Sequence, residues 1–303
     1  MTGGANIPPQ AFSSSGVEPN DPQHHEIVLT HGQWTPTTVK CKYLFTFNLS
    51  GHRRSEASLQ RRRDPDFRFF MGMGNVKIVD LSRELYHRSP SYPGQPPIIH
   101  GLWKTHEEAA TETGTGHGNS VMYFSMSDHA GTHMDAPRHF GKAGTPINEY
   151  PLENCIVPGI CLDLRHISPR AEIHPSDLEA ALKTAAVQVP KGGTVLLCTG
   201  HHERTFPKKE YATDNAGINV AATTWLAEQG VVHFGIDAMR PGPEGKINTL
   251  VHKACLDLEI THIESLCNLE ALVGEGPFTY IGLPLKWREG TGSPVRAVAV
   301  FGL

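Results

Sequence analysis

Short apolar runs separated by turn-forming residues dominate the chain from Val76 to the C-terminus. Runs of about four to eight residues that are rich in β-branched and aromatic side chains, and bounded by Gly, Pro, Asp or Ser, are typical of β-strands. Several of these runs are apolar at consecutive positions, which indicates strands that are covered on both faces. The predicted strands are VKIVDLS (76–82), SVMYFSMS (120–127), IVPGICLDL (156–164), TVLLCTG (194–200), VVHFGID (231–237), FTYIGLPL (278–285) and VRAVAVFG (295–302).

Helix signals lie between these runs. Ser176 and Glu179 are spaced as a capping box and are followed by apolar residues at helical spacing, which predicts a helix beginning near Ser176. A second helix is predicted from about Asn219 through AATTWLAEQ, ending at Gly230. A third helix is expected to begin near Thr261, in the segment THIESLCNLEAL.

Strands and helices alternate in this half of the chain, because TVLLCTG follows the first predicted helix and VVHFGID follows the second. Such alternation is typical of a sheet with parallel strands and helices packed on it. The sequence therefore predicts an α/β or mixed α+β fold, in one domain that comprises residues 75–303.

Residues 1–74 differ in composition, since they are rich in Pro, Ser, Asn and Gln and show no sustained periodicity. A segment of this kind buries too little apolar surface to order itself, so we expect a disordered N-terminal extension. Its basic cluster, Arg61, Arg62 and Arg63, is interpreted as part of a solvated tail. The alternative is a nucleic-acid-binding arm over residues 53–68, which a salt titration of binding would reveal.

Composition and charge limit the partners. The chain has 303 residues, 39% of them hydrophobic, and a formal net charge of −4. This balance argues against nucleic acid or an anionic membrane as the main partner and favours a small-molecule substrate. No apolar run reaches the roughly 18–20 residues that cross a bilayer, and no signal-peptide pattern is present, so we expect a cytoplasmic protein.

The six cysteines show no CxxC spacing and lie mostly within apolar runs, which predicts buried, reduced thiols rather than disulfides or zinc ligands. They are Cys41, Cys155, Cys161, Cys198, Cys255 and Cys267.

The segment SDHAGTHMDAPRHF (127–140) concentrates side chains that bind metals or move protons. They are His129, His133, Asp135 and His139. On an extended segment, at about 3.3 Å per residue, His129 and His133 would lie about 13 Å apart, whereas two ligands of one ion are no more than roughly 4 Å apart. The chain must therefore turn back, and Gly131 accepts the backbone conformations of such a turn. Pro137 then prevents the segment from continuing as a helix.

Two imidazoles and a carboxylate suit Zn²⁺ or Mn²⁺ and leave coordination positions open, as in catalytic rather than structural sites. The alternative is a set of histidines with separate, unrelated contacts. Four ionisable groups within eleven residues, interleaved with Gly131 and Pro137, favour a metal site.

The stretch HAGTHMDAPRH (129–139) matches the signature H-x-G-T-H-x-D-x-P-x-H. In this the chain resembles the cyclase family of metal-dependent hydrolases, which includes kynurenine formamidases and isatin hydrolases. The resemblance implies a single swivelling β/β/α-type domain and covers about residues 76–303. Further segments in the family's usual order are IVDLSREL, TGHH, WLAEQGVVHFGID, IESLCNL and PLKWREGTGSPVRAVAV.

The resemblance also implies roles for particular residues. His129, His133 and Asp135 stand at the positions that bind metal in the family, and His139 stands at the position of the acid/base. Members with two ions take further ligands from a later histidine and from a glutamate about twelve residues beyond it. His252 and Glu264 occupy those positions here, and Asp135 would then bridge the two ions. One or two ions of Zn²⁺ or Mn²⁺, and a dimer or tetramer of identical chains, are thus implied.

The implied reaction is hydrolysis of a small amide, cyclic amide or lactone by metal-activated water, with His139 as acid/base. This would make the protein a hydrolase of C–N bonds other than peptide bonds. The alternative is a non-catalytic metal-binding protein that retains the fold, but such a site has no need of His139. After GID the chain reads AMRPGPEG (238–245), where formamidases have a small hydroxyl residue and then an acidic one. This difference, and extra length at residues 102–120, indicates a pocket of different shape.

Overall fold

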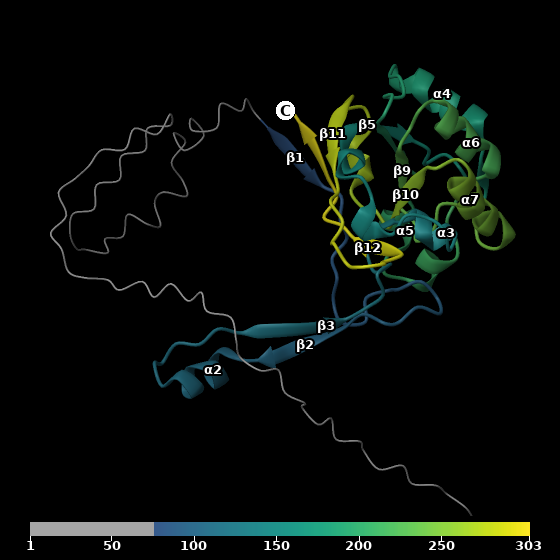
Figure 1. The fold of residues 1–303 in the computed structure, drawn as a ribbon. Helices are drawn as coiled ribbons and strands as arrows, with labels where there is room; N and C mark the ends of the chain where they lie inside the picture. The colour runs from purple at the N-terminus through teal and green to yellow at the C-terminus, as the bar shows by residue number, and fades with distance from the viewer. Residues whose placement is uncertain (1–75) are drawn as a thin grey trace, which may run out of the picture. The chain divides into compact units, whose positions relative to one another are not determined.

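The computed structural model of the protein describes residues 76–303, and these residues form a nine-stranded mixed sheet with helices packed on it (Figure 1). The strand order is β1-β13-β11-β5-β7-β9-β10-β4-β12. The extension expected over residues 1–74, and the position of Cys41, lie outside the described residues.

The middle of the sheet consists of four parallel strands joined by helical crossovers. The strands are β5 (Ile156–Asp163), β7 (Thr194–Cys198), β9 (His233–Ile236) and β10 (Thr261–Glu264). The crossovers contain α4 (Pro175–Ala185), then α5 (His201–Thr205) and α6 (Val220–Glu228), then α7 (Lys246–Asp257). This is the strand-helix-strand pattern that the sequence predicts, and it confirms the mixed α/β class.

Antiparallel strands complete the sheet on both sides. On the β5 side these are β11 (Phe278–Ile281), β13 (Val298–Phe301) and β1 (Lys77–Asp80), and on the β10 side β4 (His133–Asp135) and β12 (Gly292–Pro294). Outside the sheet, β2 (Ile99–Lys104) pairs with β3 (Val121–Ser125), and β6 (Glu172–Ile173) pairs with β8 (Gly217–Ile218). The other helical segments are α2 (His106–Thr113), α3 (Pro137–Phe140) and the 3-10 turns Ile147–Glu149, Leu152–Cys155, Lys209–Ala212 and Leu269–Leu272.

Strand β7 shows why the apolar runs of the sequence are continuous. All five of its residues are buried. Val195 and Leu197 join the apolar core beneath α4, α6 and α7, whereas Leu196 and Cys198 join a second core on the opposite face. Because successive side chains of a strand point to opposite faces, a strand covered on both faces needs apolar residues at every position.

All seven predicted strands are present, but two helix predictions need correction. Helix α4 begins at Pro175, and its capping box is formed by His174 and Asp177 rather than by Ser176 and Glu179. The helix expected near Thr261 is wrong, because residues 261–264 form strand β10. Its pairing with β9 and β4 overrides the local helical pattern. Helix α7 was not predicted, because it begins after Gly245 without a side-chain cap.

The β2–β3 hairpin carries large apolar side chains that are exposed on both of its strands. They are Leu102, Trp103, Val121, Met122, Tyr123 and Phe124, with Trp103 the most exposed at 75%. Isolated apolar residues on a surface need no explanation, whereas exposed apolar residues that neighbour one another on paired strands are typical of interaction surfaces.

The five cysteines of the described region are all buried and free. Within residues 76–303 no helix is long and apolar enough to span a membrane.

Helix α6 provides a test of how the crossovers are held. The Asn219 side chain accepts the N–H of Ala222 at 2.9 Å, and its amide group donates to Glu172 at 3.1 Å. We expect Asn219→Ala to lower the free energy of unfolding in urea by about 1–2 kcal/mol, because the cap and the tie to β6 are both lost. Glu228→Ala, at an exposed position of the same helix, should change it by less than about 0.5 kcal/mol. Equal losses would contradict this assignment.

Candidate metal centre

The pairing of β4 with β10 forms the base of the centre. The two strands run antiparallel, with His133 opposite Glu264. Because alternate side chains of a strand share a face, Asp135 lies on the same face as His133, and His262 on the same face as Glu264. Two residues along each strand, His262 lies beside Asp135, with 3.1 Å between His262 Nε2 and Asp135 Oδ2.

A turn at Gly131 brings His129 back to this face. Gly131 has a φ of +71°, in the left-handed region that favours glycine. His129 Nδ1 thereby lies 2.7 Å from Asp135 Oδ1, and His133 Nε2 lies 3.2 Å from the same oxygen. The turn that the sequence predicts is present, and it gathers His129, His133 and Asp135 into one buried group that could hold an ion.

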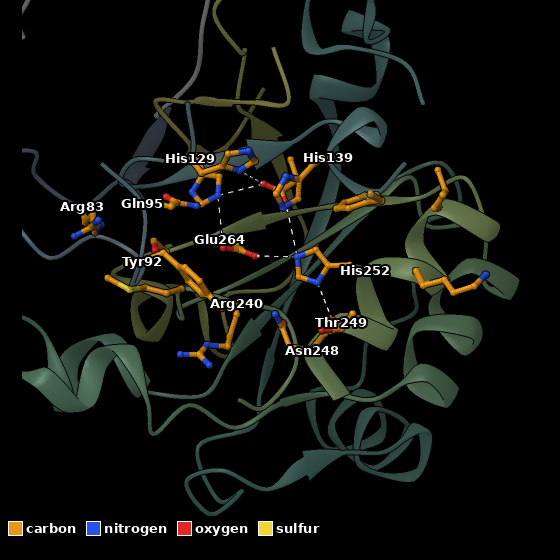
Figure 2. A pocket seen from close by; sticks show the side chains of 17 residues that line it. Arg83, Tyr92, Gln95, His129, His139, Arg240, Asn248, Thr249, His252 and Glu264 are labelled. Carbon is orange, nitrogen blue, oxygen red and sulfur yellow. Dashed lines mark hydrogen bonds and ion pairs between the residues drawn. The ribbon is translucent and has the colours of Figure 1, made fainter. Parts of the chain in front are cut away.

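A second group of potential ligands shares Asp135 and adds His252 from α7 together with His262 and Glu264 from β10. His252 Nε2 lies 3.8 Å from Asp135 Oδ2 and 4.0 Å from Glu264 Oε1. Figure 2 shows His252 and Glu264 pointing toward each other across the centre. The two groups meet at the Asp135 carboxylate, one on each oxygen.

Hydrogen bonds fix which ring nitrogens face the carboxylates. His133 Nδ1 lies 2.9 Å from the Gly131 carbonyl oxygen, and His252 Nδ1 lies 2.7 Å from that of Asn248. A ring nitrogen beside a carbonyl must donate its proton to it, so Nε2 of each ring keeps a lone pair for a metal. Imidazole and carboxylate donors at these spacings fit a divalent ion such as Zn²⁺ or Mn²⁺.

Asp128 orients His129 indirectly, through Thr291. Its Oδ2 accepts the Thr291 N–H at 2.9 Å, the Thr291 hydroxyl at 2.8 Å and the Gly292 N–H at 3.2 Å. The Thr291 hydroxyl oxygen lies 2.9 Å from His129 Nε2. This contact leaves Nδ1 of His129 as the nitrogen that faces Asp135.

The charges of the centre balance around Asp135. Burial raises the pKa of Asp135, but His129 and His262 beside it hold the pKa well below its usual range. Burial also lowers the pKa of His262, yet the neighbouring Asp135 and Glu264 raise it well above its ordinary value. Asp135 is therefore an ionised carboxylate that is only 1% exposed, and it requires cationic partners.

His139 stands at the edge of the centre, on the short helix α3 that begins at Pro137. Its Nε2 lies 3.7 Å from Asp135 Oδ2, its ring centroid lies 4.2 Å from that of His129, and its side chain is 34% exposed. His139 belongs to neither ligand group. Burial lowers its pKa and outweighs the attraction of Asp135, so the ring is neutral near pH 7.

A pocket of about 590 Å³ opens above these side chains (Figure 2). Its floor contains His129, His133, Asp135, His139, His252 and Glu264. The walls combine apolar or aromatic residues with polar and cationic ones: Tyr92, Phe140, Met239 and Leu256 belong to the first kind, and Arg83, Arg240 and Lys253 to the second. Met239 and Arg240 belong to the AMRPGPEG segment, so this segment forms part of the pocket wall.

The structure thus brings all six candidate residues of the sequence together, and it adds His262. The sequence carried a signal for His262, since a histidine two positions before Glu264 shares its face in a strand. The helical interpretation of residues 261–272 placed the two side chains on different faces and hid this signal.

Known proteins resemble this chain in sequence and in fold. Kynurenine formamidase from Erythrobacter litoralis (strain HTCC2594) is 28% identical over 223 residues, which cover 73% of this chain and 93% of that protein. An isatin hydrolase bound to the product analogue thioisatinate superposes with a TM-score of 0.66 at 20% identity, covering 82% of this chain and all of that one (100%). Isatin hydrolase A from Labrenzia aggregata, bound to benzyl benzoate, gives 0.66 at 22%, covering 81% of this chain and 100% of its own.

At these identities the solved structures establish a common fold. The sequence match to a family is more specific: residues 79–243 match the Cyclase family, described as "Putative cyclase". This match spans more than half of the chain and contains the whole of the turn from His129 to His139. The chain therefore belongs to the cyclase family.

Proposed function

We propose that the protein is a metal-dependent hydrolase that cleaves a small amide, cyclic amide or lactone, and that residues 75–303 are its hydrolase domain. The observation that carries this proposal is the Asp135 carboxylate shared by two histidine-rich ligand groups on the floor of a pocket. The names of its relatives, kynurenine formamidase and isatin hydrolase, support hydrolysis of C–N bonds other than peptide bonds.

His129, His133 and Asp135 would hold one ion, and His252 and Glu264 would help hold a second, as Zn²⁺ or Mn²⁺. A divalent ion in such a site lowers the pKa of water toward neutrality and polarises a substrate carbonyl. The protein's part is to hold each ring in the tautomer and orientation that aim its free nitrogen at the site. The carbonyl oxygens of Gly131 and Asn248 do this for His133 and His252.

His139 would move the proton. A neutral imidazole at the edge of the pocket can accept a proton from the attacking water, whose oxygen bonds to the carbonyl carbon. His139 then returns that proton to the leaving nitrogen or oxygen as the bond to the carbonyl carbon breaks. Its lowered pKa supports this role, because the neutral form is available near pH 7.

The pocket walls support a small substrate that combines apolar and polar groups. Tyr92 and Phe140 offer aromatic faces, and Met239 and Leu256 add apolar surface. The substrate is best found by assaying the metal-loaded protein with N-formylkynurenine, isatin and a panel of lactones. Turnover of none of them, by protein that holds its metal, would favour the non-catalytic alternative.

We further propose that the protein is a homo-oligomer, with the apolar β2–β3 hairpin as part of the contact. A cytoplasmic location stays a prediction from the sequence.

The ligand assignment predicts metal content. Purified protein should carry Zn²⁺ or Mn²⁺, and His133→Ala should lose most of it, because one of three strong ligands is removed. Elemental analysis of washed protein measures this, with the exposed His166→Ala as the control that should keep its metal. Unchanged metal content in His133→Ala would disprove the assignment.

The role of His139 predicts a different result. His139→Ala should keep near-normal metal content while turnover falls by about 10² or more. Since the pKa of His139 lies below its ordinary value of 6.5, the wild-type rate should rise as pH increases through a value below 6.5 and then level off. The residual rate of His139→Ala should not show this rise with pH. Loss of metal together with activity would instead make His139 a ligand.

The hairpin predicts the state of assembly. Wild-type protein should elute as a dimer or tetramer in size-exclusion chromatography with light scattering. The double variant Trp103→Glu, Phe124→Glu should shift toward monomer, because charge in an apolar contact is costly. Leu152→Glu, at a side chain that is also exposed (58%) but lies outside the hairpin, is the matched control. A monomeric wild type would exclude this interface.

A further inference from the structure

His262 is buried in a place that would suit an apolar residue. It lies on β10 with no exposed surface. Its ring stacks on Phe140 at a centroid distance of 5.2 Å, and that of Phe234 lies 5.4 Å away on a tilted plane. Buried polar groups in such surroundings are retained only where they have strong partners. The partners of His262 are the two carboxylates above it.

The Nε2 atom of His262 is held at those carboxylates. It lies 3.1 Å from Asp135 Oδ2 and 3.1 Å from Glu264 Oε1. On the other side of the ring, Nδ1 lies 3.7 Å from the Cys255 Sγ. The aromatic neighbours on the faces of the ring and the contact at Nδ1 keep it from turning, so Nε2 can reach only this point.

The same two oxygens also face His252. His252 Nε2 is 3.8 Å from Asp135 Oδ2 and 4.0 Å from Glu264 Oε1, and all four ligand atoms lie within 4.8 Å of one another. Ligands at about 2.0–2.2 Å from a tetrahedral ion are roughly 3.3–3.6 Å apart. The four spacings between a histidine nitrogen and a carboxylate oxygen, from 3.1 to 4.0 Å, lie on both sides of this range.

We propose that His262 is the fourth protein ligand of a closed tetrahedral site formed with Asp135, His252 and Glu264, in which the ion takes the place of the proton on His262 Nε2. This inference rests on the proposed metal-dependent function and assigns a structural role to one ion and a catalytic role to the other. Structural zinc sites have four protein ligands, whereas catalytic sites keep a position for water or substrate. The closed site would fix the carboxylates of Asp135 and Glu264, and the group of His129, His133 and Asp135 would remain open for the reaction.

The test uses the full chain loaded with Co²⁺, whose visible absorption is strong in tetrahedral sites and weak in octahedral ones. Wild-type protein should bind about two ions per chain, one of them with strong absorption. His262→Phe should lose that absorption and weaken the second ion by more than about 100-fold, beyond the 10–100-fold that loss of an outer-shell partner costs. The first ion should stay bound.

Two further variants make the outcome decisive. His233→Phe replaces another fully buried histidine, on the adjacent strand β9, and should keep both ions. His262→Gln restores an N–H donor to the carboxylates without an imidazole. If His262 only positions the carboxylates, His262→Gln should bind the second ion nearly as wild type does, and the proposal is wrong.

Stoichiometry separates this inference from the proposed function. Wild-type protein that binds no ion would refute both. Wild-type protein that binds a single ion, or His262→Phe that keeps two with unchanged absorption, would refute the closed site and leave the hydrolase proposal standing.

Discussion

The carboxylate of Asp135 is the group on which the centre depends. It is 1% exposed and ionised, and an unpaired charge at that depth would cost several kcal/mol. His129 and His133 approach one of its oxygens, and His252 and His262 approach the other. This arrangement suits a bridging ligand, because each oxygen has its own set of nitrogen partners. Elements far apart in the sequence converge on this one side chain.

The sheet provides the rigidity that such convergence requires. Strand β4 lies between β10 and β12, so the strand that carries Asp135 is paired on both sides. The crossover from β9 to β10 contains α7, and His252 on this helix faces the side chains of His262 and Glu264 on β10. Pro137 starts a short helix after β4 and brings His139 back over the same face. Ligands set on strands and helices are held more firmly than ligands set on loops.

Connecting segments form the surroundings of the centre. Met239 and Arg240 line the pocket from the segment of residues 238–245, and the Arg240 guanidinium lies 5.3 Å from the ring centroid of Tyr92. The apolar β2–β3 hairpin comprises Ile99–Lys104 and Val121–Ser125. Reaction chemistry on a fixed sheet, with specificity in the connecting segments, is the usual division in enzymes.

Much of this could be predicted from local sequence. The seven apolar runs are all strands, and in β7 the run is continuous because burial of both faces demands apolar residues at every position. The turn at Gly131 followed from the distances that one ion imposes on His129 and His133. Those signals lie within a few residues of the structure they determine. The secondary structure of residues 261–264 could not be predicted from such local signals. This short segment is a strand only because it pairs with β9 on one side and β4 on the other. Only that pairing, between segments distant in the chain, places His262 beside Asp135.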